Sequence, residues 1–264
     1  MRACHETACQ TNVRVGCDSR LPSRQNIVHV AARAEASVKV YGVVSRKGGS
    51  AKSLAARSFA VQAAIDGQRA AIVDLDPQQT CMLWAKRRPH LAPSVESVAD
   101  RNIDAALTAL KGRGAQIVLL DTPPHNQPLI NLAVQASAAC IITTGTGPED
   151  VEQVGPIVEI VRAFGRPAAI LLCRTQPRTS ALVLARAALS TFGVPICPVA
   201  ITQSVAHVYA AAEGLTASER EPKSKPAAEI EEAWRWIERT MASGTSAGEL
   251  SDLGAARARK ARAR

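Results

Sequence analysis

The feature that most constrains the fold is a regular alternation of short apolar runs with longer stretches of helical spacing. The runs are continuously apolar, as is typical of strands buried on both faces of a parallel sheet. The expected strands are 38–45, 69–76, 116–124, 138–147, 168–174 and 194–199. The expected helices are 53–67, 78–88, 102–110, 126–137, 149–164, 179–191, 203–213 and 227–241. This order predicts an α/β fold with a single doubly wound, mostly parallel sheet and helices on both faces.

The alternating pattern occupies residues 37–241 and defines one expected domain, for which a chain of 264 residues is long enough. Residues 1–36 show no clear period, and we interpret them as a loose N-terminal extension. Residues 242–264 form a basic tail rich in Ala and Arg. That tail is either a solvated end or an arm that adds contacts to phosphates.

The charge balance indicates an acidic partner. The net charge is +9, which favours nucleic acid first and an anionic membrane surface second. Aromatic residues make up only 3% of the chain, so contact with a duplex backbone is expected rather than stacking on single strands. No apolar run approaches the length of a membrane span, and no membrane partner is expected. Seven irregularly spaced cysteines are typical of a reduced, cytoplasmic protein.

A glycine-rich loop, SRKGGSAKSL at residues 45–54, follows the first expected strand and leads into a helix. This context suits phosphate binding, because backbone N–H groups and the helix dipole then point at the anion. Lys52 would reach the β- and γ-phosphates, and the Ser53 hydroxyl would hold Mg²⁺. The candidate nucleotide-binding residues are Lys47, Gly48, Gly49, Ser50, Ala51, Lys52, Ser53 and Leu54. Taken alone, the glycine pair is also compatible with an ordinary turn.

Acidic residues close two later strands. Asp74 and Asp76 end the second strand, where alternation would place both on one face. Asp121 ends the third strand after four apolar residues, and a buried carboxylate there needs a partner such as hydrated Mg²⁺. Acids at strand ends also cap the next helix, so each one alone leaves both interpretations open. Because parallel strands end at one edge of a sheet, the loop and acids together predict a nucleotide site.

The segments KGGSAKS, DLDPQ and DTPP, in this order and spacing, resemble the ParA/MinD group of deviant Walker A ATPases. The resemblance is closest to the ParA partition proteins of plasmids and chromosomes, and it covers about residues 38–241. It implies a P-loop NTPase fold and slow hydrolysis of ATP with Mg²⁺. It further implies an ATP-bridged homodimer that binds double-stranded DNA non-specifically. A ParB-like adaptor would stimulate hydrolysis, and the protein would associate with the nucleoid in the cytoplasm.

The resemblance also implies roles for individual residues. Lys47 corresponds to the signature lysine, which reaches the partner's phosphates across the dimer and offsets charge in the transition state. Asp76 corresponds to the acid that orients or activates the attacking water, so Lys47 and Asp76 are the expected catalytic residues. Asp121 corresponds to the Walker B acid. The expected metal-binding set is Ser53, Asp74 and Asp121, with both acids acting through water.

Four residues depart from the family pattern. Ala51 replaces the glycine before the catalytic lysine, where a methyl group would crowd the phosphates or strain the loop. Leu54 replaces the usual Thr or Ser. Cys173 stands near the position where many relatives of that family have an Asn that reads adenine, and Ser204 stands where they often have an Arg that binds DNA. A second hypothesis is therefore a nucleotide-impaired module that binds DNA or a partner protein.

A third hypothesis is a MinD-like positioning ATPase, which the tail fits poorly because it has few large apolar residues for a membrane surface. Non-specific DNA affinity needs only a cluster of cations, because counterion release does not depend on exact geometry. The candidate DNA contacts are Lys86, Arg87, Arg88, Arg174, Arg178, Lys223 and Lys225.

Overall fold

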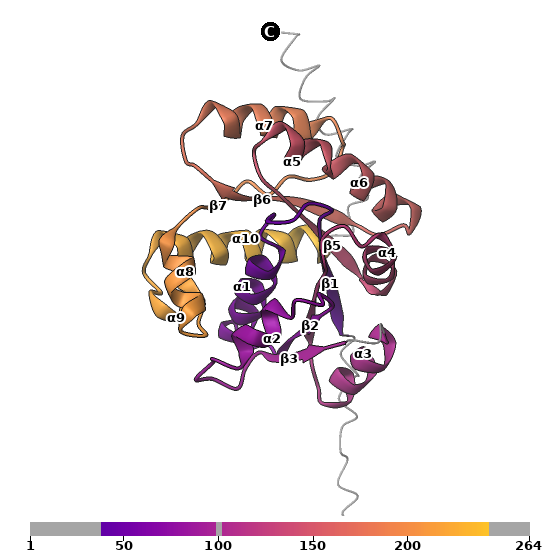
Figure 1. Cartoon of the computed structure of the whole chain (residues 1–264), viewed down its shortest axis with the longest axis vertical. Coiled ribbons are helices and arrows are strands. Elements are labelled where there is room, and N and C mark those ends of the chain that lie inside the picture. Colours follow the sequence, from indigo (N-terminus) through magenta and orange to yellow (C-terminus); the bar gives the residue numbers. More distant parts are fainter. Residues whose placement is uncertain (1–37, 99–101, 243–264) are drawn as a thin grey trace, which may run out of the picture. The chain divides into compact units, whose positions relative to one another are not determined.

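The computed structural model describes residues 38–98 and 102–242. Within these ranges one seven-stranded sheet carries helices on both faces (Figure 1). The strand order is β3-β2-β4-β1-β5-β6-β7, and neighbouring strands run parallel throughout. The doubly wound α/β fold predicted from the alternating pattern is confirmed.

The elements follow one another as strand and helix along most of the chain. The strands are β1 (Lys39–Val44), β2 (Ala70–Asp74), β3 (Ser94–Ser97), β4 (Ile117–Asp121), β5 (Ala139–Thr144), β6 (Ala168–Thr175) and β7 (Ile201–Thr202). The first helices are α1 (Lys52–Ile65), α2 (Thr80–Ala85), α3 (Ile103–Gly112), α4 (Gln127–Ala136) and α5 (Pro148–Glu152). The later ones are α6 (Val154–Ala163), α7 (Ser180–Ser190), α8 (Val205–Ala212), α9 (Ala217–Arg220) and α10 (Lys225–Ala242).

Both edges of the sheet differ from the prediction. The segment 194–199 forms only a single bridge, between Ile170 and Ile196, and the sheet ends instead with β7. Pro195 and Pro198 explain the difference, because proline lacks the N–H that a continuous ladder needs. At the other edge β3 was not expected, since its sequence SVES contains no apolar run.

The helical predictions differ from the structure in two places. The single helix expected at 149–164 is divided into α5 and α6 near Gln153. Pro156 lies just after this break and cannot donate the N–H that would bind the preceding turn. The short helix α9 was also not expected.

The two faces of the sheet bury different helices. On one face α1 packs on β1, β2 and β4, and α10 packs on β6 and β7. Trp234 of α10 stacks on Phe59 of α1 with ring centroids 5.4 Å apart, and its edge meets Tyr41 of β1. On the other face α3, α4 and α6 cover β2, β1 and β5. Since each buried ring contributes roughly 1.5–3 kcal/mol, these contacts fix α1 and the loop before it on the sheet.

The expected extension at 1–36 lies outside the described residues. The expected tail at 242–264 also lies outside them except for Ala242, the last residue of α10. No helix in the described ranges is long and apolar enough to cross a bilayer.

Candidate functional site

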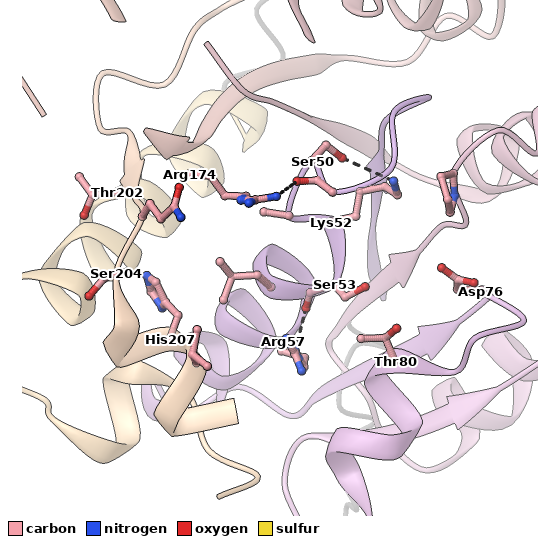
Figure 2. A pocket seen from close by; sticks show the side chains of 16 residues that line it. Ser50, Lys52, Ser53, Arg57, Asp76, Thr80, Arg174, Thr202, Ser204 and His207 are labelled. Carbon is pink, nitrogen blue, oxygen red and sulfur yellow. Dashed lines mark hydrogen bonds between the residues drawn. The ribbon is translucent and has the colours of Figure 1, made fainter. Parts of the chain in front are cut away.

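A cavity of about 480 Å³ lies at the carboxyl edge of the sheet. Residues 49–54 of the glycine-rich loop line one side of it, and the β7–α8 segment lines the other (Figure 2). Asp76 and Thr80 approach from the β2–α2 side. The volume is within the range of small-molecule sites, and the position is where ligands bind in open parallel sheets.

The glycine-rich loop delivers an uncapped helix N-terminus to this cavity. Ala51 is the N-cap residue of α1, and no side chain in the described part of the chain accepts from the first turn of that helix. The first N–H groups of the 14-residue helix are therefore available to an anion. Ala51 has φ = 67°, a left-handed conformation that costs a residue with a Cβ about 1 kcal/mol. The strain expected at this position is present.

Lys52 is held against its own loop. Its side chain is buried, and Nζ donates to the carbonyl of Lys47 at 3.0 Å and to Ser50 Oγ at 3.5 Å. Thr143 of β5 donates to the same Ser50 hydroxyl at 3.3 Å, a contact that sequence reasoning missed. Burial lowers the pKa of Lys52, while the nearby Asp121 and Asp76 raise it. The ammonium thus lies beside the helix N-terminus, in a position to bind the same anion.

Asp74 caps a helix. It is fully buried at the end of β2, where Oδ2 accepts from the backbone N–H groups of Cys81 (2.8 Å) and Met82 (3.0 Å) in the first turn of α2. Oδ1 accepts from the N–H of Asp76 at 3.1 Å. Burial raises the pKa of Asp74, and these three bonds oppose the rise. The expected role of Asp74 in the Mg²⁺ water shell stays a prediction.

Asp76 lies beyond the end of β2 and lines the cavity. The alternation argument that placed Asp74 and Asp76 on one face of a strand is therefore wrong, because the strand ends at Asp74. The expectation that Asp76 faces the site is met by a different route: the turn after β2 carries it there (Figure 2).

Asp121 is fully buried at the end of β4, in register with Asp74 on β2. Its Oδ2 accepts from the Cys81 thiol at 3.1 Å, and its Oδ1 has no hydrogen-bond partner among the described residues. Burial raises the pKa of Asp121 to about 6, and Ser53, Cys81 and Lys52 oppose that rise. An orphaned buried carboxylate oxygen near a serine hydroxyl fits a hydrated Mg²⁺, which prefers oxygen ligands.

Lys47 pairs with an acid that the motifs did not indicate. Its Nζ lies 2.6 Å from Oδ1 of Asp150, at the start of α5, and the hydrogen bond to Asp150 raises the pKa of Lys47. The other oxygen of Asp150 accepts from the N–H of Gly147 at 3.3 Å. At Gly145 a Cβ would lie 2.2 Å from that oxygen, so a larger residue there would displace the Asp150 carboxylate from this position. The GTGPED sequence after an apolar run was the available signal for this site.

The far side of the cavity differs from the sequence expectation. Cys173 is buried in β6 and does not line the cavity, whereas its neighbour Arg174 does. Arg174 donates from Nη1 to the carbonyl of Gly49 at 2.9 Å and so connects β6 to the glycine-rich loop (Figure 2).

Ser204 caps α8 by accepting from the N–H of Ala206 at 3.2 Å. Leu54 lines the cavity and packs on the core behind it.

Four of the basic residues expected to contact DNA have other partners. Arg87 donates to the carbonyl of Ala211 at 3.3 Å, and Lys225 lies 3.5 Å from Glu229. The Arg88 side chain is 2% exposed, lies 2.7 Å from Glu219 and stacks over Trp84 at 4.3 Å. It therefore joins the segment after α2 to α9 and cannot meet DNA. Arg174 lies in the cavity, as described above. Apart from Arg88, all the candidates are exposed: Lys86, Arg87, Arg174, Arg178, Lys223 and Lys225.

Residues 41–217 match the family model described as the CobQ/CobB/MinD/ParA nucleotide binding domain. No curated protein matches the sequence.

Solved structures share the fold at low sequence identity. The cell division ATPase MinD of Pyrococcus furiosus is 18% identical, with a TM-score of 0.63 over 77% of this chain and 99% of that one. The septum site-determining protein MinD of Pyrococcus horikoshii OT3, in complex with Mg-ADP, is 17% identical. Its TM-score is 0.61, and the match covers 76% of this chain and 96% of that one. A putative plasmid partition protein of Borrelia burgdorferi B31, bound to AMPPNP, is 14% identical. Its TM-score is 0.62, and the match covers 77% of this chain and 99% of that one.

Proposed function

Because the chain belongs to the CobQ/CobB/MinD/ParA family of nucleotide-binding domains, we propose that it is a ParA-type ATPase that hydrolyses ATP slowly with Mg²⁺. The observation that carries this proposal is the buried, unpartnered oxygen of Asp121 near the uncapped start of α1. One site then offers anion-binding N–H groups and an acceptor for a hydrated cation. The Mg-ADP and AMPPNP bound to two similar structures support an adenine nucleotide as the ligand.

Residues that line the cavity, and two acids buried behind it, would have separate roles in binding and hydrolysis. The loop N–H groups and Lys52 would bind the phosphates, with the Lys52 ammonium exchanging the Lys47 carbonyl for phosphate oxygens. Ser53 and Asp121 would hold Mg²⁺, Asp121 through water and Asp74 in support. Bound Mg²⁺ supplies positive charge that offsets the charge developing on the phosphates. Asp76, which lines the cavity, would orient the attacking water.

Lys47 links hydrolysis to assembly. In the proposed mechanism it leaves Asp150 and reaches the phosphates held by the partner in an ATP-bridged homodimer. The dimer would bind double-stranded DNA non-specifically through exposed cations and the basic tail, and the net charge of +9 supports this. A ParB-like adaptor would stimulate hydrolysis and release, as expected for plasmid or chromosome partition on the nucleoid.

An ATPase assay with and without DNA tests the proposal. Wild type should show slow turnover that requires Mg²⁺ and stops in EDTA. Lys52→Ala should reduce turnover by about a hundredfold or more, because it removes a cation from the transferred phosphate. Lys39→Ala is the matched control, since it removes an exposed lysine at the start of β1 that neither lines the cavity nor is a candidate DNA contact. If Lys52→Ala hydrolyses ATP at the wild-type rate, the proposal is wrong.

The nucleotide-impaired module remains a second candidate because of Ala51. Its left-handed backbone and the methyl group at the cavity both act against tight phosphate binding. This candidate predicts DNA binding that is the same with and without ATP, whereas the ATPase predicts tighter, salt-sensitive binding with ATP. A vesicle pull-down with anionic lipid separates both from a MinD-like positioning ATPase.

A further inference from the structure

His207 of α8 brings a second unsatisfied polar group to the cavity. Its side chain is buried, with 8% exposed, and neither Nδ1 nor Nε2 has a hydrogen-bond partner within the described part of the chain. The ring lines the cavity beside Ser204, on the side opposite the glycine-rich loop (Figure 2). A buried ring with two unpartnered nitrogens is unfavourable unless a ligand or a water supplies the partners.

The neighbouring charged groups do not satisfy this ring. Glu229 of α10 uses its carboxylate on Thr202, accepting from the N–H and the hydroxyl, each at 2.9 Å, and it also pairs with Lys225. Arg57 of α1 donates from Nε to the carbonyl of Ser53 at 3.0 Å. Burial lowers the pKa of His207, and Arg57 adds to this while Glu229 opposes it. The neutral ring that results offers one hydrogen-bond donor and one acceptor.

The position of His207 in the cavity selects the part of a nucleotide that it can meet. Phosphates bound at the start of α1 would lie on the loop side, where Lys52 lines the cavity and the buried Asp121 lies near it. The cavity continues from there to the β7–α8 side, so the rest of the ligand would extend toward that side. There the Ser204 hydroxyl already accepts from Ala206, whereas the ring of His207 is unpaired.

We propose that His207 hydrogen-bonds the nucleoside part of the bound nucleotide, at the base edge or at a ribose hydroxyl, and is a specificity-determining residue. The inference rests on the proposed function and adds a residue outside the loop and the strand-end acids. It predicts that His207 affects nucleosides selectively and leaves the binding of a bare polyphosphate unchanged.

Calorimetric titration in Mg²⁺ tests this with ATP, 2′-deoxy-ATP, GTP and inorganic tripolyphosphate. His207→Leu should weaken ATP by about tenfold, the value of one or two lost hydrogen bonds, and should change tripolyphosphate less than twofold. His207→Gln keeps a donor and an acceptor, so ATP affinity should stay within about threefold of wild type. If 2′-deoxy-ATP binds the wild type more weakly than ATP and His207→Leu removes the difference, the contact is to the ribose. If His207→Leu keeps the difference between ATP and 2′-deoxy-ATP but no longer binds ATP more tightly than GTP, the contact is to the base.

The controls separate failure of the inference from failure of the proposed function. If His207→Leu lowers the affinities for ATP and tripolyphosphate equally, or changes neither, the inference is overturned while the nucleotide site stands. The same holds if His207→Gln loses as much ATP affinity as His207→Leu. If wild type binds neither ligand, the proposed function fails and the inference fails with it. Lys52→Ala should weaken both ligands, and thermal unfolding of each variant checks that it is folded.

Discussion

Replacing Asp121 with Asn should stabilise the ligand-free protein at alkaline pH while abolishing its response to Mg²⁺. The reason is that the Asp121 carboxylate is fully buried and leaves Oδ1 without a partner in the described structure. Without a cation the ionised form is therefore unfavourable in the folded state. Asn keeps the shape and one acceptor for the Cys81 thiol, and it carries no charge.

The size of the effect follows from the ionisation of Asp121. Burial raises its pKa from 3.8 to about 6 in the folded protein. Well below pH 3.8 both states hold the proton and the penalty is absent. Between pH 4 and 6 the unfolded chain releases the proton while the folded protein keeps it, so stability is lost as the pH rises. Above pH 6 the full penalty applies, roughly 3 kcal/mol.

Urea unfolding in EDTA, at pH 4.5 and at pH 8, measures this penalty. The free energy of unfolding of Asp121→Asn, relative to wild type, should rise by about 2 kcal/mol between the two pH values. Any constant effect of the amide on packing cancels in this difference. Adding Mg²⁺ at pH 8 should stabilise wild type and not the variant. If the difference in free energy of unfolding between Asp121→Asn and wild type is the same at both pH values, the reasoning is refuted, because the carboxylate would then ionise without penalty.

Three further substitutions test other parts of the site. Ala51→Gly should raise the free energy of unfolding by about 1 kcal/mol in thermal or urea unfolding, because glycine adopts φ = 67° without strain; a loss of stability would contradict this. Asp150→Asn frees Lys47 and should lower the ATP concentration needed for dimerisation about two- to fivefold in light scattering, whereas an increase would show that the pair assists assembly. Cys81→Ala removes the thiol that donates to Asp121 and should shift the Mg²⁺ dependence of ATPase activity. Cys81→Ser keeps a donor at this position and should retain the wild-type Mg²⁺ dependence.

The alternating apolar runs were sufficient to predict the fold because buried parallel strands must be apolar throughout. The strands that the pattern misplaced, β3 and β7, lie at the edges of the sheet, where the apolar requirement is weakest. The glycine-rich loop and Asp121 were identified for a related reason. A loop or an acid at the end of a buried strand can occupy only one edge of a parallel sheet.

The residues that the sequence did not reveal are brought to the cavity by tertiary contacts. Arg174 was expected to contact DNA and His207 was not singled out at all, and both lie more than 100 residues from the glycine-rich loop. Cys81 meets Asp121 only because Asp74 anchors the first turn of α2. Asp150 reaches Lys47 because a glycine turn after β5 admits its carboxylate. Each of these contacts depends on the distance between two segments, which a single sequence does not encode in a readable pattern.

Because of the contact between Lys47 and Asp150, ionic strength should have two opposite effects on this protein. Both side chains are partly exposed, at 39% and 24%, so dissolved ions weaken their attraction. More salt would therefore release Lys47 more often while also reducing the attraction of the basic surface to DNA. The two effects act in opposite directions on any assay that couples dimerisation to DNA binding. Such an assay would show an optimum at intermediate ionic strength, and Asp150→Asn should move that optimum toward lower salt.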